Sequence, residues 1–163
     1  MLRPNKHWLP VLLWMGFIFV MSTGVGSFEH TSRFIGPLLK ALFPTAAPAT
    51  LGLMHFIIRK AAHFTEYAIL ALLTRRAVRS SVESDQAGKA LRMAAIAFLI
   101  ASAYAATDEL HQVFVPGRTA SLGDVLIDMS GASAAISAAT LWQWRRARKN
   151  AAIPPNRLQS TGG

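Results

Sequence analysis

The sequence contains no cysteine, which excludes disulfide bonds and zinc–thiolate sites and leaves the redox compartment open. Charged residues are also scarce, because Asp, Glu, Lys and Arg make up 15% of the chain, compared with about 25% in a typical soluble domain. The chain has no nucleophile elbow, no phosphate-binding glycine loop and no complete phosphatase signature. The sequence therefore identifies no reaction and no cofactor, and whether the protein is an enzyme stays open.

Apolar residues, in contrast, are abundant: the chain is 52% hydrophobic and its mean hydropathy is +0.33. This balance predicts an integral membrane protein. The net charge is +9, from 17 Lys and Arg against 8 Asp and Glu. The basic residues lie mainly at the ends of apolar stretches, where anionic lipid headgroups and membrane topology explain them. Since no nucleic-acid motif accompanies them, we expect membrane lipids as partners and no nucleic acid; the oligomeric state stays open.

Four apolar stretches are candidate membrane spans. They lie near Trp8–Met21, and from about Leu51 to Leu73, Ala90 to Ala106 and Asp124 to Trp144. A spanning helix needs about 20 residues, so the first stretch must extend beyond its apolar core. We therefore predict an all-α polytopic membrane protein with a bundle of about four transmembrane helices. Residues 1–144 form its membrane domain, and residues 145–163 form a basic, disordered tail.

The first stretch has a second interpretation. Arg3 and Lys6 followed by a short apolar run and small residues also fit a secretory signal peptide. No A-x-A cleavage pattern follows the run, which favours a retained helix.

The distribution of basic residues predicts the orientation of the bundle. Most Lys and Arg residues lie at the N-terminus, in the connection from Arg75 to Arg92, and in the C-terminal tail. Basic residues accumulate on the cytoplasmic side of membrane proteins. Both termini are therefore predicted to be cytoplasmic, with an even number of spans.

Two polar clusters interrupt the apolar stretches. The first comprises Arg59, Lys60, His63, Glu66 and Tyr67; the second comprises Asp108, Glu109, His111, Gln112, Arg118, Ser121, Asp124 and Asp128. A charge at membrane depth costs about 2.5 kcal/mol or more, so it usually faces a bundle interior and has a partner. On helices, each cluster forms an axial stripe. With the predicted topology both clusters meet near the outer leaflet, and we predict one site that faces the cell envelope.

Some of these residues also have structural interpretations. Ser121 and Asp124 follow a turn signal and fit the capped start of a helix. Arg118 suits a loop or lipid-phosphate contact, and His111 lies on the far side of its helix from Asp108. A buried ion pair that fixes helix register would also explain His63 and Glu66. A single pair would serve that role, so the larger number of polar groups favours a site.

The motifs resemble those of the VanZ-like family. The pattern Lys60-x-x-His63-Phe64-x-x-Tyr67, followed by Asp108-Glu109-x-x-Gln112 and then Arg118-x-x-Ser121-x-x-Asp124, is similar to the family pattern over roughly residues 10–142. The family is named for a small membrane protein linked to teicoplanin resistance in bacteria. The resemblance implies a multi-spanning protein of the bacterial cytoplasmic membrane. One departure is Asp128, where family members often carry Asn, and it leaves the ligand preference open.

Two functional hypotheses follow. In the first, the protein binds or processes an anionic, lipid-linked cell-envelope molecule, with His63, Asp108 and Glu109 as catalytic candidates. Its ligand-binding candidates are Arg59, Lys60, Tyr67, Gln112, Arg118, Asp124 and Asp128. In the second, the protein is a non-enzymatic scaffold or accessory subunit with a structural ion network. A proton-coupled transporter is disfavoured because four spans show no internal repeat, and the histidine and carboxylate spacing is not diagnostic of a metal site.

Two further segments have predicted structural roles. Residues 22–50 include an amphipathic stretch, His30–Phe43, that fits either an interfacial helix or a lid over the bundle. Gly131, Ala135 and Ala139 form a small-residue stripe, which predicts close helix packing.

Overall fold

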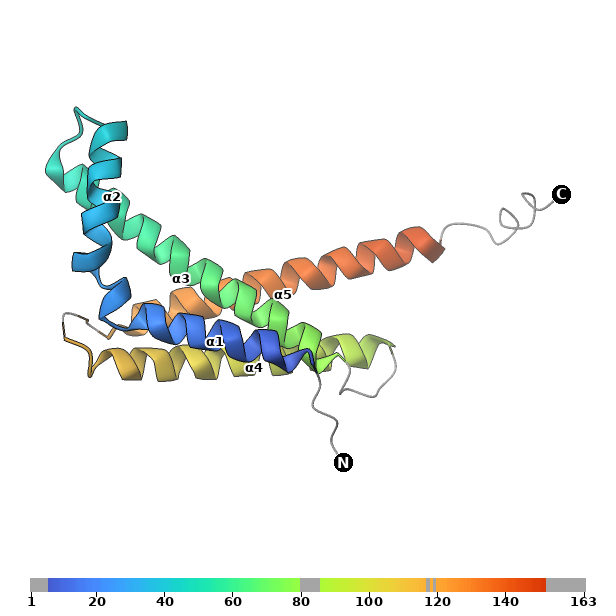
Figure 1. Cartoon of the computed structure of the whole chain (residues 1–163). Helices are drawn as coiled ribbons and strands as arrows, with labels where there is room; N and C mark the ends of the chain where they lie inside the picture. Colours follow the sequence, from blue (N-terminus) through green and yellow to red (C-terminus); the bar gives the residue numbers. More distant parts are fainter. Residues whose placement is uncertain (1–5, 80–85, 117, 119, 152–163) are drawn as a thin grey trace.

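The computed structural model of the protein describes residues 6–79, 86–116, 118 and 120–151, and every regular element in these residues is helical (Figure 1). The α-helices are α1 (Trp8–Ser22), α2 (Phe28–Leu42), α3 (Pro48–Val78), α4 (Gln86–Gln112) and α5 (Leu122–Ala151), and a 3-10 turn, η1 (Gly24–Gly26), joins α1 to α2. The all-α fold class predicted from the sequence is confirmed. Arg3, which entered the signal-peptide interpretation, lies outside the described residues.

Three long helices form the body of the molecule. Helices α3, α4 and α5 pack against one another, and α1 packs against α3 and α4. At the crossing of α3 and α5, a Cβ atom on Gly131 would collide with the backbone carbonyl oxygen of Phe64. The glycine therefore permits a close approach of the two backbones, in agreement with the predicted small-residue stripe.

The core is built largely from small residues. Ala97, Ala101 and Ala105 recur every four residues on α4, and all three are buried together with Tyr67 and Leu70 of α3. Many large apolar side chains point outward instead, among them Leu13, Phe34, Leu99, Leu126 and Trp142. Soluble proteins rarely expose so many large apolar groups, whereas a membrane protein presents them to lipid.

By length and composition, two helices of the described residues are able to cross a membrane: the segments Gly88–Gln112 of α4 and Leu122–Asn150 of α5. The bent pair of α1 with η1 and α2 turns by 65° and adds a third candidate if it counts as one span. Helix α3 has 31 residues, but it contains Arg59, Lys60 and Glu66 and is not among these candidates. The structure thus supports two or three spans, and the four-span bundle stays a prediction.

The structure defines the limits of α5 and of the helix within residues 22–50. Helix α5 continues to Ala151, so the first residues of the predicted disordered tail are helical, and residues 152–163 lie outside the described residues. The amphipathic stretch within residues 22–50 forms α2, which is capped by Ser27, whose hydroxyl accepts a hydrogen bond from the His30 backbone N–H (3.3 Å). Helix α2 turns away from α1 and lies beside the N-terminal part of α3 (Figure 1).

Candidate functional site

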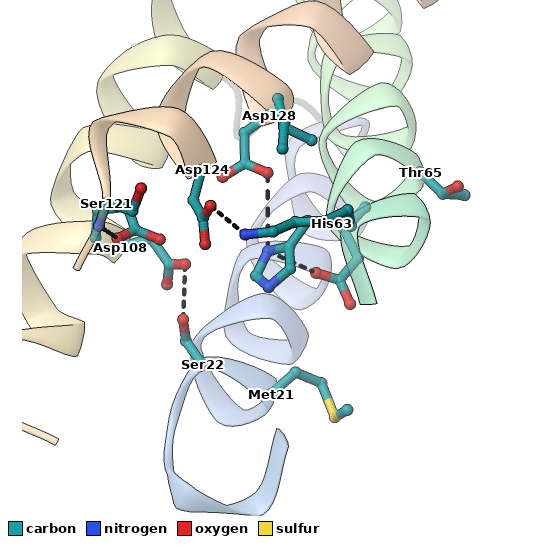
Figure 2. A network of polar contacts seen from close by, with 12 residues as sticks. Met21, Ser22, His63, Thr65, Asp108, Ser121, Asp124 and Asp128 are labelled. Carbon is teal, nitrogen blue, oxygen red and sulfur yellow. Dashed lines mark hydrogen bonds and ion pairs between the residues drawn. The ribbon is translucent and has the colours of Figure 1, made fainter. Parts of the chain in front are cut away.

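The two polar clusters of the sequence meet where the C-terminal end of α1, the middle of α3, the end of α4 and the start of α5 come together. Figure 2 shows His63, Asp108, Asp124 and Asp128 pointing toward one another from three helices. The predicted convergence of the two clusters is therefore observed. Some side chains of this region form contacts between helices, and others line a cavity.

Helices α3 and α5 are joined by charged side chains. Lys60 forms an ion pair with Asp124, which places Asp124 of the first turn of α5 against α3. One turn further, Nδ1 of His63 lies 3.7 Å from Oδ1 of Asp128 and 4.0 Å from Oε2 of Glu66. Asp128 is 0% exposed, and neither of its carboxylate oxygens has a hydrogen-bond partner among the described residues. His63 is therefore the group closest to satisfying this buried carboxylate.

The end of α4 is held to the end of α1 by a closed hydrogen-bond network. The Ser22 hydroxyl donates to Oδ2 of Asp108 (2.6 Å), and the Gln112 amide donates to Ser22 Oγ (3.0 Å) and to the same Asp108 oxygen (3.2 Å). All three side chains are buried. Asp108 is thus already engaged by two donors, which suits a structural role better than the catalytic role predicted for it.

Glu109 links α4 to the start of α5. Its Oε2 accepts a hydrogen bond from the Ser121 backbone N–H (2.8 Å), while Oε1 is buried with no hydrogen-bond partner in the described part of the chain. The Ser121 hydroxyl accepts from the Gly123 backbone N–H (3.1 Å), as expected of a residue that caps a helix.

Arg118 comes from the connection between α4 and α5 and reaches the end of α1. Its Nη2 donates to the carbonyl oxygens of Met21 (2.6 Å) and Thr23 (3.2 Å). The Met21 carbonyl is among those that a helix end leaves without an intrahelical partner. Nε and Nη1 of Arg118 are buried and have no hydrogen-bond partner among the described residues. Burial, followed by the positive charge of Arg59, lowers the pKa of Arg118 from its ordinary value.

A cavity of about 200 Å³ lies beside these groups. Its polar lining includes Arg59, His63, Glu66 and Arg118, and Ile18, Met21, Ser22, Gly26, Thr31, Ile35, Ile58 and Ala62 complete its wall. Thr31 and Ile35 belong to α2, so this helix covers one side of the cavity. Of the two roles that the sequence left open for residues 22–50, an interfacial helix and a lid, this arrangement favours the lid.

A shallow groove of about 380 Å³ adjoins the cavity along α1 and α3. Trp14, Ile58, Ala61, Ala62, Thr65, Glu66 and Ile69 line it, and Ile58, Ala62 and Glu66 also line the cavity. The Trp14 indole N–H donates to the backbone carbonyl oxygen of Glu66 (2.9 Å) and fixes one side of the groove. An apolar surface thus leads directly to a charged cavity.

Several predicted site residues lie outside the cavity wall. Lys60, Asp108, Glu109, Gln112, Asp124 and Asp128 are absent from its lining, because they contact neighbouring helices instead. Tyr67 is 0% exposed and packs in the core, with its ring 6.4 Å from that of Tyr104. The predicted structural role of His111 agrees with its ring, which stacks on Phe19.

Sequence reasoning missed three parts of this region. Ser22, Trp14 and the carbonyl oxygens at the end of α1 all contribute contacts. Ser22 is the first polar residue after a long apolar run, which signals a helix end and carries no separate signal for a site. Among the residues that the structure describes, no three His, Cys, Asp or Glu side chains are grouped as metal ligands would be.

Comparison with known proteins gives one match. A protein-family model described as VanZ/LLP1 matches residues 7–143 of this chain. No curated protein and no solved structure matches this chain.

Proposed function

Because this chain belongs to the VanZ/LLP1 family, as its motifs predicted, we propose that it binds an anionic, lipid-linked cell-envelope molecule. The anionic group enters the cavity beside Arg118, and the attached lipid lies in the adjoining groove. Two features support the proposal: the chain belongs to a family of membrane proteins, and its charged cavity adjoins an apolar groove.

The observation that carries the proposal is the buried guanidinium of Arg118. Two of its nitrogen atoms, Nε and Nη1, lack hydrogen-bond partners in the described residues, although the side chain lines a cavity. An unpaired buried donor is unfavourable, and donors on a charged group are more so. A phosphate or carboxylate in the cavity would accept from these nitrogens, with Arg59 on the same wall contributing a second positive charge.

The dimensions agree with a headgroup rather than a whole lipid. The cavity volume of about 200 Å³ is smaller than the roughly 300–1,000 Å³ of pockets for drug-sized ligands. A hydrocarbon chain therefore needs a separate surface, and the groove lined by Trp14, Ile58 and Ile69 supplies one. A lipid would enter sideways from the membrane, with its charged end in the cavity beside the two arginines.

In this proposal α1, α3, α4 and α5 all cross the membrane, and both termini are cytoplasmic. Helix α3 tolerates its charged residues because Lys60 pairs with Asp124 of α5, and His63 and Glu66 lie next to each other at the cavity wall. The cavity then lies toward the outer leaflet of the bacterial cytoplasmic membrane, as the distribution of basic residues predicts.

His63 is the candidate for proton transfer within the cavity. It lines the cavity, and its Nδ1 faces the Asp128 carboxylate at 3.7 Å. A carboxylate beside Nδ1 fixes the orientation of the histidine ring, which leaves Nε2 for a ligand. The carboxylate beside His63 is thus that of Asp128, and not that of Asp108 or Glu109, the two carboxylates predicted from the sequence as catalytic candidates.

The test compares lipids that co-purify with the full chain. Wild type, Arg59→Gln and Arg118→Gln are extracted in a mild detergent and measured by native mass spectrometry, with thermal unfolding as a check on folding. Arg33→Gln is the matched control, because Arg33 is an exposed residue of α2 outside the cavity wall. We expect an anionic lipid to be retained by wild type and Arg33→Gln and lost from both cavity variants. Identical lipid profiles in all four folded proteins would refute the binding site.

The closed contacts between helices favour a scaffold as the second candidate function. Asp108, Ser22 and Gln112 satisfy one another, and Lys60 pairs with Asp124, so these residues fix the arrangement of the helices without a ligand. If the scaffold is the whole function, lipid retention will follow thermal stability in every variant. Loss of lipid from a variant of unchanged stability would exclude it.

A further inference from the structure

A second hollow lies at the opposite end of the bundle from the cavity. It is a groove of about 670 Å³ between the end of α3, the first turns of α4 and the last turns of α5. In Figure 1 the C-terminal part of α5 diverges from α4 at this end. We call it the basal groove; its lining comprises Arg79, Lys89, Ala90, Met93, Thr140, Trp142, Gln143, Trp144, Arg146, Ala147 and Asn150.

Among the described residues, the charged side chains that line the basal groove are all positive. Arg79, Lys89 and Arg146 come from three different helices or their ends, and no Asp or Glu of the described residues lines the groove. Arginines and lysines that converge without a carboxylate repel one another, so the arrangement favours an anion between them.

A buried cation lies next to this groove. Arg75 is 6% exposed, and its Nη2 donates to the neutral side chains of Gln143 (2.8 Å) and Thr140 (3.4 Å), both of which line the groove. Its Nε is buried without a hydrogen-bond partner in the described part of the chain. A buried arginine usually has a carboxylate partner, whereas the described contacts of Arg75 are all to neutral groups. Its positive charge therefore adds to the field in the groove.

The remaining lining residues are suited to a lipid. Trp142 and Trp144 are 60% and 50% exposed, as expected for tryptophans at a membrane–water interface. The arginines Arg146 and Arg148 stack on these rings. Ala90 of α4 and Ala147 of α5 add an accessible apolar surface next to the cations. A soluble anion would use the cations alone, but an amphipathic lipid would use both surfaces.

We propose that the basal groove binds an anionic phospholipid of the adjacent leaflet. Its phosphate lies between Arg79, Lys89 and Arg146, and its acyl chains run along Ala90 and Ala147. This site shares no lining residue with the cavity beside Arg118, so its occupancy does not depend on the function proposed there.

The experiment uses the two groove tryptophans as reporters. The chain has four Trp residues, and in a Trp8→Phe/Trp14→Phe background the fluorescence comes from Trp142 and Trp144. The protein in detergent micelles is titrated with phosphatidylglycerol whose acyl chains carry bromine, which quenches nearby indoles. Brominated phosphatidylcholine tests whether the negative charge matters.

A pair of double variants separates a site from general surface charge. Arg79→Gln/Lys89→Gln removes two positive charges from the groove, and Arg145→Gln/Lys149→Gln removes two exposed charges of the same end that do not line it. We expect the first pair to weaken phosphatidylglycerol binding about 30-fold, which corresponds to about 2 kcal/mol, and the second pair less than threefold. The exposed positions of Arg79, Arg145 and Lys149 make these changes compatible with folding.

Three results would overturn the proposal. They are equal losses in both double variants, equal binding of the two lipids, and displacement of phosphatidylglycerol by sodium phosphate at equal concentration and constant ionic strength. The last result would assign the groove to a soluble phosphate compound instead.

Discussion

Substitution of Gly131 by alanine tests the close approach of α3 and α5 on which the site depends. A Cβ at this position would collide with the carbonyl oxygen of Phe64, and the neighbouring atoms, C and Cα of Phe64, are also backbone at 2.9 and 3.1 Å. Backbone cannot rotate away as a side chain can, so the helices must separate. Phe64 follows His63 directly, and the separation would therefore also lengthen the 3.7 Å distance from His63 to Asp128.

The expected destabilisation by Gly131→Ala is that of an overpacked core, about 1–3 kcal/mol. For a chain of this size each kcal/mol lowers the unfolding temperature by about 2–4 °C, so we expect a decrease of about 2–12 °C. The matched control is Gly52→Ala in α3, where a Cβ meets nothing within 4 Å. Alanine there should stabilise the helix by about 0.5–1 kcal/mol.

Both variants are measured as full chains in the same detergent by the temperature dependence of circular dichroism. A Gly131→Ala protein that unfolds at or above the temperature of the Gly52→Ala protein would refute the reasoning, because the two alanines would then meet equivalent surroundings.

Two further substitutions test the contacts between helices. Ser22→Ala removes the hydroxyl that donates to Asp108 at 2.6 Å, and we expect a loss of about 1.5–3 kcal/mol, measured by thermal unfolding; an unchanged unfolding temperature would show that Gln112 alone satisfies Asp108. Lys60→Asp places two carboxylates together, whereas Lys60→Asp/Asp124→Lys restores an opposite-charge pair. The double variant should recover about 0.5–3 kcal/mol relative to the sum of the single variants, and additive losses in the same assay would exclude a direct interaction.

Much of this fold follows from sequence pattern. The apolar stretches predict α1, α3, α4 and α5, since a run of apolar residues near membrane length is stable as a helix. Their exact limits do not follow, because propensity rather than hydropathy determines where a helix ends. The residues of α5 after Trp144 are rich in Arg and Ala, which favour helix, and α5 accordingly continues to Ala151.

The sequence predicts which polar residues come together, but it does not predict which of them line the cavity. Charged residues in apolar helices must face inward, which is why His63, Asp124 and Asp128 meet. Which of them faces the cavity depends on the rotation of each helix about its axis, and a stripe on a single helix does not fix this rotation relative to its neighbours. Lys60 and His63 share a stripe on α3, yet only His63 lines the cavity.

The contacts at the end of α1 are beyond sequence pattern altogether. Arg118 donates to two backbone carbonyl oxygens, from Met21 and Thr23, and any residue supplies a carbonyl. Gly26 contributes by the absence of a side chain, since a Cβ there would collide with the Met21 carbonyl oxygen that accepts from Arg118. Such contacts depend on the path of the chain and leave no mark in residue type except the glycine.

The hydrogen bond from Trp14 to the Glu66 carbonyl has a practical consequence. It holds an indole at 2.9 Å from that carbonyl, on the wall of the groove beside the cavity. Indole emission shifts to shorter wavelength when water around the ring is replaced by hydrocarbon, so the protein carries a natural optical label at this position. A variant with Trp14 as its single tryptophan would report the arrival of an acyl chain in real time, without any attached dye.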